Sequence, residues 1–173
     1  MSDARYPPAA LLILLAVAAL GCGSGTDGQT SRNQIHCGGS IDRVDSADGL
    51  GVTVLDAVVF PVDPVQTGGR VGPTGTPHAG LQFAKFGLLV REGVELRLET
   101  DSRRQPRALM EWAPVELDRP SEVLTVGPCT EAGGGWLAFP GGVWVSEPGC
   151  VVIEVSSGAQ TAEARVGVDR PCK

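Results

Sequence analysis

The stretch CVVIEVSSGAQTAEARVGV, residues 150–168, decides the fold class of this chain. Apolar and polar side chains alternate through it, so that Val151, Ile153 and Val155 point to one side of an extended strand. Ser157-Gly158 begins a turn, and small apolar residues recur at every second position of the return, namely Ala162, Ala164, Val166 and Val168. The stretch therefore predicts a β-hairpin with one buried face.

The same period of two continues outward from this hairpin. VELRLET (94–100) alternates Val94, Leu96 and Leu98 with charged residues, the pattern of a strand with one solvated face. Turn signals rich in Gly and Pro separate further β-type runs, which are GVTVLDAVVF (51–60), LQFAKFGLLV (81–90), RALMEW (107–112), EVLTVG (122–127) and WLAF with VWV (136–145). We therefore predict an all-β fold, an antiparallel β-sandwich, with an immunoglobulin-like topology as one form of it.

The N-terminal segment is typical of an export signal. Residues 9–20, AALLILLAVAAL, form an apolar run too short to cross a bilayer, which takes about 20 residues, but typical of a signal peptide. The sequence Ala19-Leu20-Gly21-Cys22 then resembles the lipobox of bacterial lipoproteins, although Ala19 and Leu20 stand in the reverse of the usual order. The resemblance implies that Cys22 carries acyl chains such as palmitate. A plain signal peptide cut near Gly21 and an apolar core helix are the alternatives.

These observations divide the chain into a lipoprotein signal peptide (1–21), a lipidated Cys22 with a flexible tether (22–36) and one β-sandwich domain (37–173). The segment GSGTDGQTSRNQI (23–35) holds a single apolar residue, so it buries too little surface to offset its ordering entropy. We expect the mature protein on the extracytoplasmic face of the cell membrane, held there by the lipid.

The cysteine count supports this division. An odd number of cysteines in an exported chain leaves one to explain, and setting Cys22 aside leaves four that can form two disulfides. Cys150 and Cys172 flank the predicted hairpin, which favours their pairing and leaves Cys37 to pair with Cys129. The pairs Cys129–Cys150 and Cys37–Cys172 stay open as the alternative.

The net charge of −6 argues against nucleic acid as a partner, because phosphate binding needs a basic surface. The motifs G-x-S-x-G, H-E-x-x-H, G-x-x-x-x-G-K-[ST] and D-x-D-x-D-G do not occur. We expect His36 and His78 to be exposed rather than catalytic. Asp42, Asp45 and Asp48 are candidate calcium ligands, with a polar turn as the plainer interpretation. No cofactor and no metal are expected.

Two groups of side chains remain as binding candidates. The first is the arginines of LRLETDSRRQPR, which are candidates for an anionic sugar or lipid headgroup, or simply balance nearby carboxylates: Arg97, Arg103, Arg104 and Arg107 with Glu95, Glu99 and Asp101. The second is the tryptophans, which are candidates for stacking on carbohydrate or belong to the core: Trp112, Trp136 and Trp144. The Gly- and Pro-rich stretch 61–80 is long enough to suggest a functional loop.

The segment from Cys129 to Cys172, with WLAFPGGVWVSEPGC (136–150) and RVGVDRPC (165–172), resembles the C-terminal half of secreted or lipid-anchored proteins of high-GC actinobacteria. The resemblance implies an exported β-domain and no mechanism. We expect a non-catalytic binding or interaction module at the cell envelope, with an envelope protein or glycan as its partner. An envelope hydrolase that acts on glycans or peptides through carboxylates and a purely structural envelope protein are the alternatives.

Overall fold

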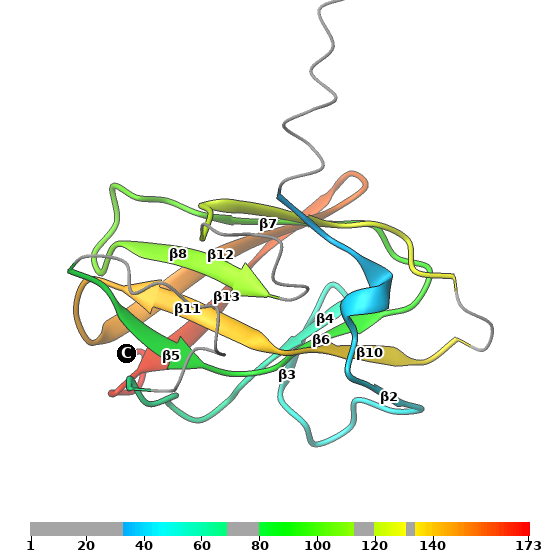
Figure 1. Cartoon of the computed structure of the whole chain (residues 1–173), viewed down its shortest axis with the longest axis horizontal. Helices are drawn as coiled ribbons and strands as arrows, with labels where there is room; N and C mark the ends of the chain where they lie inside the picture. Colours follow the sequence, from blue (N-terminus) through cyan, green and yellow to red (C-terminus); the bar gives the residue numbers. More distant parts are fainter. Residues whose placement is uncertain (1–32, 69–79, 113–119, 131–133) are drawn as a thin grey trace, which may run out of the picture.

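The computed structural model describes residues 33–68, 80–112, 120–130 and 134–173, which are almost entirely β-strands and turns (Figure 1). The predicted signal peptide, Cys22, most of the predicted tether and His78 lie outside these residues. Within the described ranges, no helix is long and apolar enough to span a membrane.

The first sheet contains the predicted hairpin at one edge, and its strands follow the order β1-β9-β7-β12-β13. Their bounds are β1 Gln34–Ile35, β7 Leu96–Thr100, β9 Val123–Val126, β12 Gly149–Ser157 and β13 Gln160–Val168. The hairpin β12–β13 turns at Gly158, whose φ of 57° is easy only for glycine and suits the first central position of a two-residue turn. The alternation predicted for this hairpin is confirmed, since Val151, Ile153 and Val155 are all buried.

The second layer is built on two long strands that bend. β5 (Gln82–Lys85) pairs with β11 (Gly141–Val145), and β6 (Leu88–Arg91) pairs with β10 (Trp136–Phe139). The register does not slip at the bend, because Phe86 N donates to Gly141 O at 2.9 Å between the two paired segments. The sheets β2-β10-β6-β4-β3 and β5-β11-β8 are therefore two halves of one bent sheet.

Shorter strands complete the bent sheet. These are β2 (Asp42–Val44), β3 (Val52–Val54), β4 (Val58–Phe60) and β8 (Ala108–Trp112), and the 3-10 turn η2 (Cys37–Gly39) precedes β2. The core lies between the two layers, and its largest buried side chains come from both, among them Trp112, Phe60, Phe139, Ile35 and Leu98. Each such aliphatic or Phe side chain contributes about 1.5–3 kcal/mol of transfer free energy. The predicted antiparallel β-sandwich is confirmed.

The strand order is more specific than the prediction. An immunoglobulin constant-type domain has one sheet of four strands and one of three, whereas the sheets here have five, five and three strands. The sheets therefore differ in strand number from those of an immunoglobulin constant-type domain.

Two of the predicted strands are each divided. The run 51–60 is the hairpin β3–β4, because Leu55 and Asp56 adopt left-handed conformations with φ of 54° and 52° and reverse the chain. The run 81–90 breaks at Phe86-Gly87, where the sheet bends. A mostly apolar run does not reveal such a break, since apolar residues stand on both sides of it.

The fold begins before residue 37. Gln34–Ile35 forms strand β1, which pairs with β9 in parallel, and Ile35 is completely buried in the core. The single apolar residue of the segment 23–35 is thus a core residue, and the described end of the expected tether belongs to the sheet.

Both favoured disulfides are confirmed. Cys37 is bonded to Cys129 and Cys150 to Cys172, with Cα–Cα distances of 5.5 and 4.9 Å, within the usual range for disulfides. The alternative pairing is therefore excluded.

Candidate functional site

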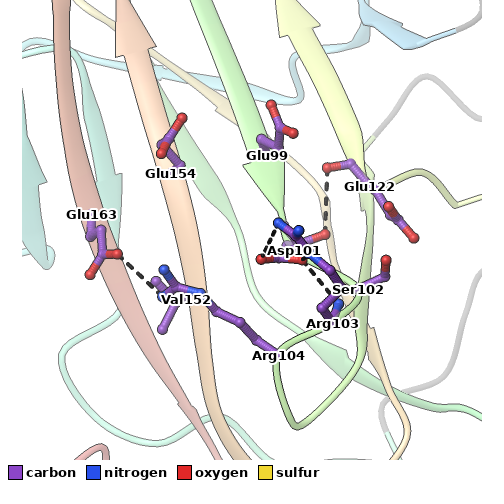
Figure 2. Close-up of a pocket in the computed structure, with 10 residues that line it drawn as sticks. Glu99, Asp101, Ser102, Arg103, Arg104, Glu122, Val152, Glu154 and Glu163 are labelled. Atoms are coloured by element: carbon purple, nitrogen blue, oxygen red, sulfur yellow. Dashed lines mark hydrogen bonds and ion pairs between the residues drawn. The ribbon is translucent and has the colours of Figure 1, made fainter.

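The outer face of the first sheet carries a group of charged side chains on neighbouring strands. In the register of β7, β12 and β13, Glu99 lies opposite Glu154 and Glu154 opposite Glu163, so three glutamates form a row across neighbouring strands (Figure 2). Like charges placed directly opposite destabilise a sheet unless counter-charges compensate them. The row therefore depends on counter-charges from neighbouring side chains.

An open cavity of about 350 Å³ lies over this row, and we call it the acidic cavity. Five carboxylates and two guanidinium groups line it, and the full lining is Glu99, Thr100, Asp101, Ser102, Arg103, Arg104, Glu122, Val152, Glu154 and Glu163. Figure 2 shows these side chains converging from β7, from the turn that follows β7, and from β12 and β13.

Arginines of the 96–107 segment neutralise some of the carboxylates that line the acidic cavity. Arg97 pairs with Glu99 at 2.7 Å, and Arg103 holds both oxygens of Asp101 at 2.9 and 3.1 Å. The hydrogen bonds from the side chain and then the backbone N–H of Arg103 lower the pKa of Asp101. The interpretation of these arginines as partners of nearby carboxylates is thus confirmed for Arg97 and Arg103.

Arg104 pairs with a carboxylate that the sequence did not suggest. Its Nη1 lies 3.2 Å from Oε1 of Glu163, which is 59 residues away on β13. This ion pair joins the turn after β7 to the edge strand, and it closes one side of the acidic cavity.

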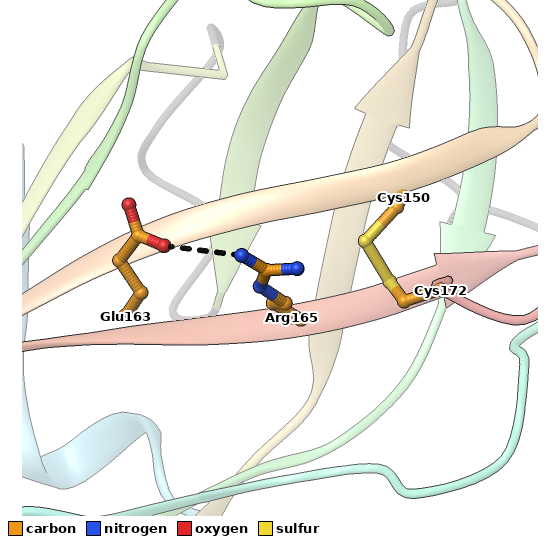
Figure 3. The surroundings of a disulfide bond; sticks show 4 residues. All are labelled: Cys150, Glu163, Arg165 and Cys172. Atoms are coloured by element: carbon orange, nitrogen blue, oxygen red, sulfur yellow. Dashed lines mark ion pairs between the residues drawn. A yellow bond between two sulfur atoms is a disulfide. The ribbon is translucent and has the colours of Figure 1, made fainter.

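A second cavity of about 480 Å³ adjoins the first, and we call it the basic cavity. Its lining is Gln105, Pro106, Glu147, Cys150, Val152, Arg165, Arg170, Pro171 and Lys173. Val152 on β12 lines both cavities, so they form one continuous surface with an acidic and a basic end. The disulfide Cys150–Cys172 borders the basic end (Figure 3).

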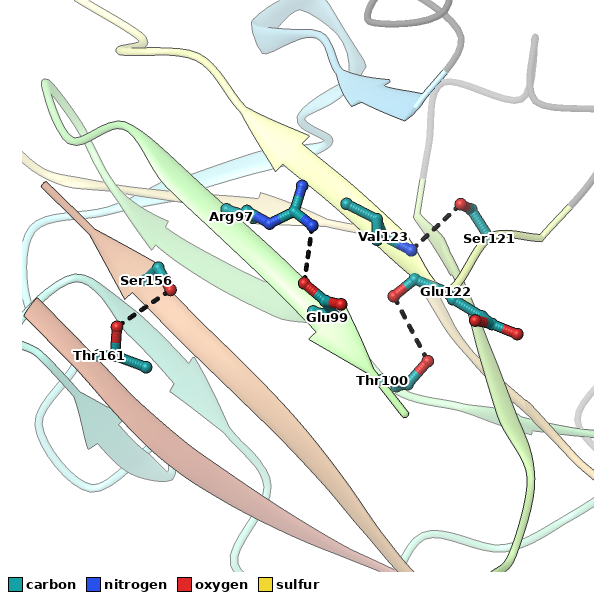
Figure 4. Close-up of polar contacts among 8 residues, drawn as sticks. All are labelled: Arg97, Glu99, Thr100, Ser121, Glu122, Val123, Ser156 and Thr161. Carbon is teal, nitrogen blue, oxygen red and sulfur yellow. Dashed lines mark hydrogen bonds and ion pairs between the residues drawn. The ribbon is translucent and has the colours of Figure 1, made fainter. Parts of the chain in front are cut away.

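A buried threonine fixes the edge of the acidic cavity. Thr100 is 3% exposed, and its hydroxyl donates to Ala108 O at 2.9 Å, with Glu122 O at 3.4 Å (Figure 4). Its backbone N–H also donates to Glu122 O at 2.8 Å. Thr100 therefore joins the end of β7 both to β9 and to β8 of the other layer, which holds the 101–107 turn in place.

The other candidate residues do not gather at this surface. His36 is exposed and precedes η2. Asp42 lies in β2, while Asp45 and Asp48 lie in the loop that follows, and all three are exposed. Among the described residues, no group of three or more His, Cys, Asp or Glu side chains is placed to hold a metal ion.

All three tryptophans are buried, so none of them offers a ring face to a carbohydrate. Trp112, Trp136 and Trp144 are 1%, 7% and 3% exposed. Trp112 packs edge-on against Phe86 in the core, and Arg91 lies 5.6 Å from the centre of the Trp136 ring. The indole N–H of Trp144 donates to Glu111 at 2.6 Å.

The described part of the stretch 61–80 connects the two layers instead of covering a cavity. Val65 forms a bridge with Val168 at the end of β13, and Thr67 forms one with Ala84 in β5. Thr67 also donates from its backbone N–H and its hydroxyl to Asp169, at 2.7 and 2.6 Å. These two hydrogen bonds, the side-chain one first, lower the pKa of Asp169.

Sequence reasoning missed the basic cavity. Arg165, Arg170 and Lys173 are spread over nine positions, and only the disulfide brings the last two back over the sheet. Fixing the pairing of Cys172 first, and then asking which charges flank it, would have found Arg170 and Lys173.

Comparisons with known proteins add no identity. No protein-family model matches this chain, and no curated protein is significantly similar to it. The candidate site therefore stands on its geometry alone.

Proposed function

We propose that this chain is a lipid-anchored protein of the extracytoplasmic face that binds an envelope ligand, without catalysis, through the outer face of its first sheet. The observation that carries the proposal is the pair of adjoining cavities that meet at Val152, one acidic and one basic. A charged and open surface of this kind suits recognition of a polar ligand by charge complementarity. An envelope glycan or protein is the expected partner.

The cysteines support the anchor. Cys37, Cys129, Cys150 and Cys172 are all consumed in two disulfides, which fit an oxidising compartment. The lipobox-like Ala19-Leu20-Gly21-Cys22 then accounts for the fifth cysteine as the lipidation site.

A hydrolase that works through carboxylates has less support. A general acid needs a pKa raised toward neutrality, whereas Arg103 holds the pKa of Asp101 below its ordinary value. The carboxylates of the acidic cavity instead serve as acceptors for ligand N–H and O–H groups or for cations.

The anchor is tested by the mass of the mature protein purified from membranes. We expect an N-terminus at Cys22 with an added diacylglycerol and acyl mass, and loss of that mass in Cys22→Ala. An unmodified Cys22, or a mature protein released into the medium, would refute the anchor.

The binding surface is tested with a blocking variant. Val152→Arg places a long side chain between the two cavities, and Thr161→Arg makes the same charge change at an exposed position of the same face. We expect Val152→Arg to abolish binding of the purified chain to isolated envelope material, while Thr161→Arg retains it. Equal binding by both variants would remove this surface as the ligand site.

A further inference from the structure

The basic cavity has the opposite charge to the chain that contains it. The whole chain has a net charge of −6, yet Arg165, Arg170 and Lys173 face a single carboxylate, Glu147, in this cavity. The side chains of this lining therefore carry two positive charges in excess.

The protein itself does little to neutralise these cations. Arg165 lies 3.8 Å from Glu163, a long ion pair between side chains that are 58% and 42% exposed. Within the described part of the chain, neither Arg170 nor Lys173 forms an ion pair with a carboxylate. Five carboxylates lie on the other side of Val152. The position of the segment after β13 therefore determines that the positive and negative side chains are separated.

A disulfide and two glycines place the tail. After β13 the chain turns at Asp169, whose φ is 55°, and Cys172 is bonded to Cys150 on β12. Gly167 lies opposite Cys150 in the sheet, and a Cβ there would come within 2.5 Å of Arg170 O. The tail can therefore lie across the outer face only because this position has no side chain.

The second glycine, Gly149, leaves room for residues that line the basic cavity. A Cβ on Gly149 would lie 2.7 Å from Pro106 Cδ and 3.4 Å from Arg170 Nη2. Pro106 is buried and belongs to the turn that also carries Arg103 and Arg104. The positions of Arg170 and Pro106 are thus both set by the backbone of β12, which makes the cavity a constructed feature rather than a gap between mobile side chains.

We propose, building on the function proposed above, that the basic cavity binds one phosphate group, as the free ion or on a lipid headgroup. Guanidinium groups bind phosphate oxygens through paired hydrogen bonds, and Lys173 adds a point charge. A phosphate monoester carries about −1.5 to −2 charges at pH 7, opposite in sign to the excess charge of the lining side chains. The acidic cavity across Val152 repels further anions, so a single phosphate fits this surface and a long polyanion does not.

The proposal is tested by calorimetric titration of inorganic phosphate into the full chain, purified in a nonionic detergent. We expect saturable binding that Arg170→Gln and Lys173→Gln each weaken by about tenfold, the loss of a charge-assisted hydrogen bond. Two variants match these charge changes outside the basic cavity. Arg91→Gln lies on β6 and Lys85→Gln on β5, outside both cavities, and both are expected to bind phosphate as the unaltered chain does.

A double variant without the Cys150–Cys172 disulfide tests how the site is constructed. In Cys150→Ala/Cys172→Ala the tail is released while Cys37–Cys129 remains, and we expect phosphate affinity to fall by tenfold or more with an unchanged β-sheet circular dichroism spectrum. Undiminished binding in this folded variant would overturn the proposal, as would equal weakening by Arg91→Gln, or no saturable binding.

The source of the phosphate is separated by a second titration. Dihexanoyl phosphatidylglycerol is compared with dihexanoyl phosphatidylcholine, each with the unaltered chain and with Arg170→Gln. Tighter binding of the anionic lipid than of inorganic phosphate, lost in Arg170→Gln, identifies a headgroup, and the reverse order identifies the free ion. If phosphate fails to bind while Val152→Arg still abolishes envelope binding, this inference falls and the proposed function stands.

Discussion

Single side chains that connect separate elements of this fold through hydrogen bonds have more defined roles than any residue of the candidate site. Asp169 accepts two hydrogen bonds from Thr67 and so links the end of β13 to the segment that leads toward β5. Glu92 is buried to 4% exposure, and its Oε2 accepts from Arg43 at 2.9 Å and from Gly135 N at 3.0 Å. Its Oε1 has no hydrogen-bond partner, so Glu92 is half-satisfied.

Asp169 is expected to make stability depend on pH. Its pKa in the folded state lies below the ordinary value of 3.8, so its stabilising contribution is complete above pH 3.8 and is lost as the pH falls through the folded pKa. Asp169→Asn removes this contribution. In urea unfolding, the free-energy difference between the unaltered chain and Asp169→Asn should therefore shrink from pH 7 to pH 3 and below. A constant difference across that range, or a Thr67→Val variant that leaves the pH dependence unchanged, would contradict this assignment.

Glu92→Gln is expected to lower the free energy of unfolding by about 1–3 kcal/mol, because it weakens the bond to Arg43 and buries an amide N–H₂ where Oε1 already lacks a partner. Glu95→Gln, at an exposed position three residues on, is the matched control and should change stability by less than about 0.5 kcal/mol. Chemical denaturation of both variants measures the difference. Equal stabilities would show that Glu92 is not a structural anchor.

The strands show which parts of a β-protein a sequence can reveal. Alternation predicted β7, β12 and β13 and the buried face of each, because one side of these strands is core and the other is water. It did not predict the β3–β4 turn or the bend of β5–β6, since each run is mostly apolar on both sides of its break. β1 was not predicted, because a strand of two residues is too short to show an alternating pattern.

The candidate site was less accessible to sequence reasoning than the fold. The arginines of 96–107 and their local carboxylates could be named, since each pair lies within two residues along β7 or its turn. The row of Glu99, Glu154 and Glu163 depends on the register of three strands, which no local pattern reports. The basic cavity depends on a disulfide that folds the tail back.

The bent sheet gives a prediction at the scale of an element. A Cβ on Gly142 would lie 2.1 Å from Ala84 O on the neighbouring strand β5, a contact with backbone that cannot move aside cheaply. Gly142→Ala should therefore destabilise the fold by about 1–3 kcal/mol. Gly38→Ala is the control, because a Cβ there meets nothing within 4 Å. Thermal unfolding of the two variants should differ in midpoint, and coincident midpoints would mean that β11 and β5 can separate without cost.

At the scale of the whole molecule, the two disulfides differ in the length of chain they close. Cys37–Cys129 spans 92 residues and ties β1 to the middle of the chain, whereas Cys150–Cys172 spans 22 residues at one edge. In the loop-entropy model the first stabilises by about 4.6 kcal/mol and the second by about 3.4 kcal/mol.

Replacing each pair by alanine tests this order. Cys37→Ala/Cys129→Ala should lose more unfolding free energy than Cys150→Ala/Cys172→Ala, since it opens the longer loop and also removes the buried Cys129. Denaturant unfolding under non-reducing conditions measures both. A larger loss from the shorter bridge would show that the clipped tail, and not the closed loop, dominates stability.

The long disulfide also determines how the protein responds to mechanical force. A pull applied between the two ends of the chain cannot extend residues 38–128, because the bond Cys37–Cys129 bypasses them. At about 3.3–3.6 Å per residue, more than about 300 Å of contour length stays hidden until that bond is reduced. Beyond the bridge, β1 contributes only two residues of pairing, so a load on the tether reaches the sandwich through a covalent bond. In its oxidised form the domain thus keeps residues 38–128 from being extended when its two ends are pulled apart.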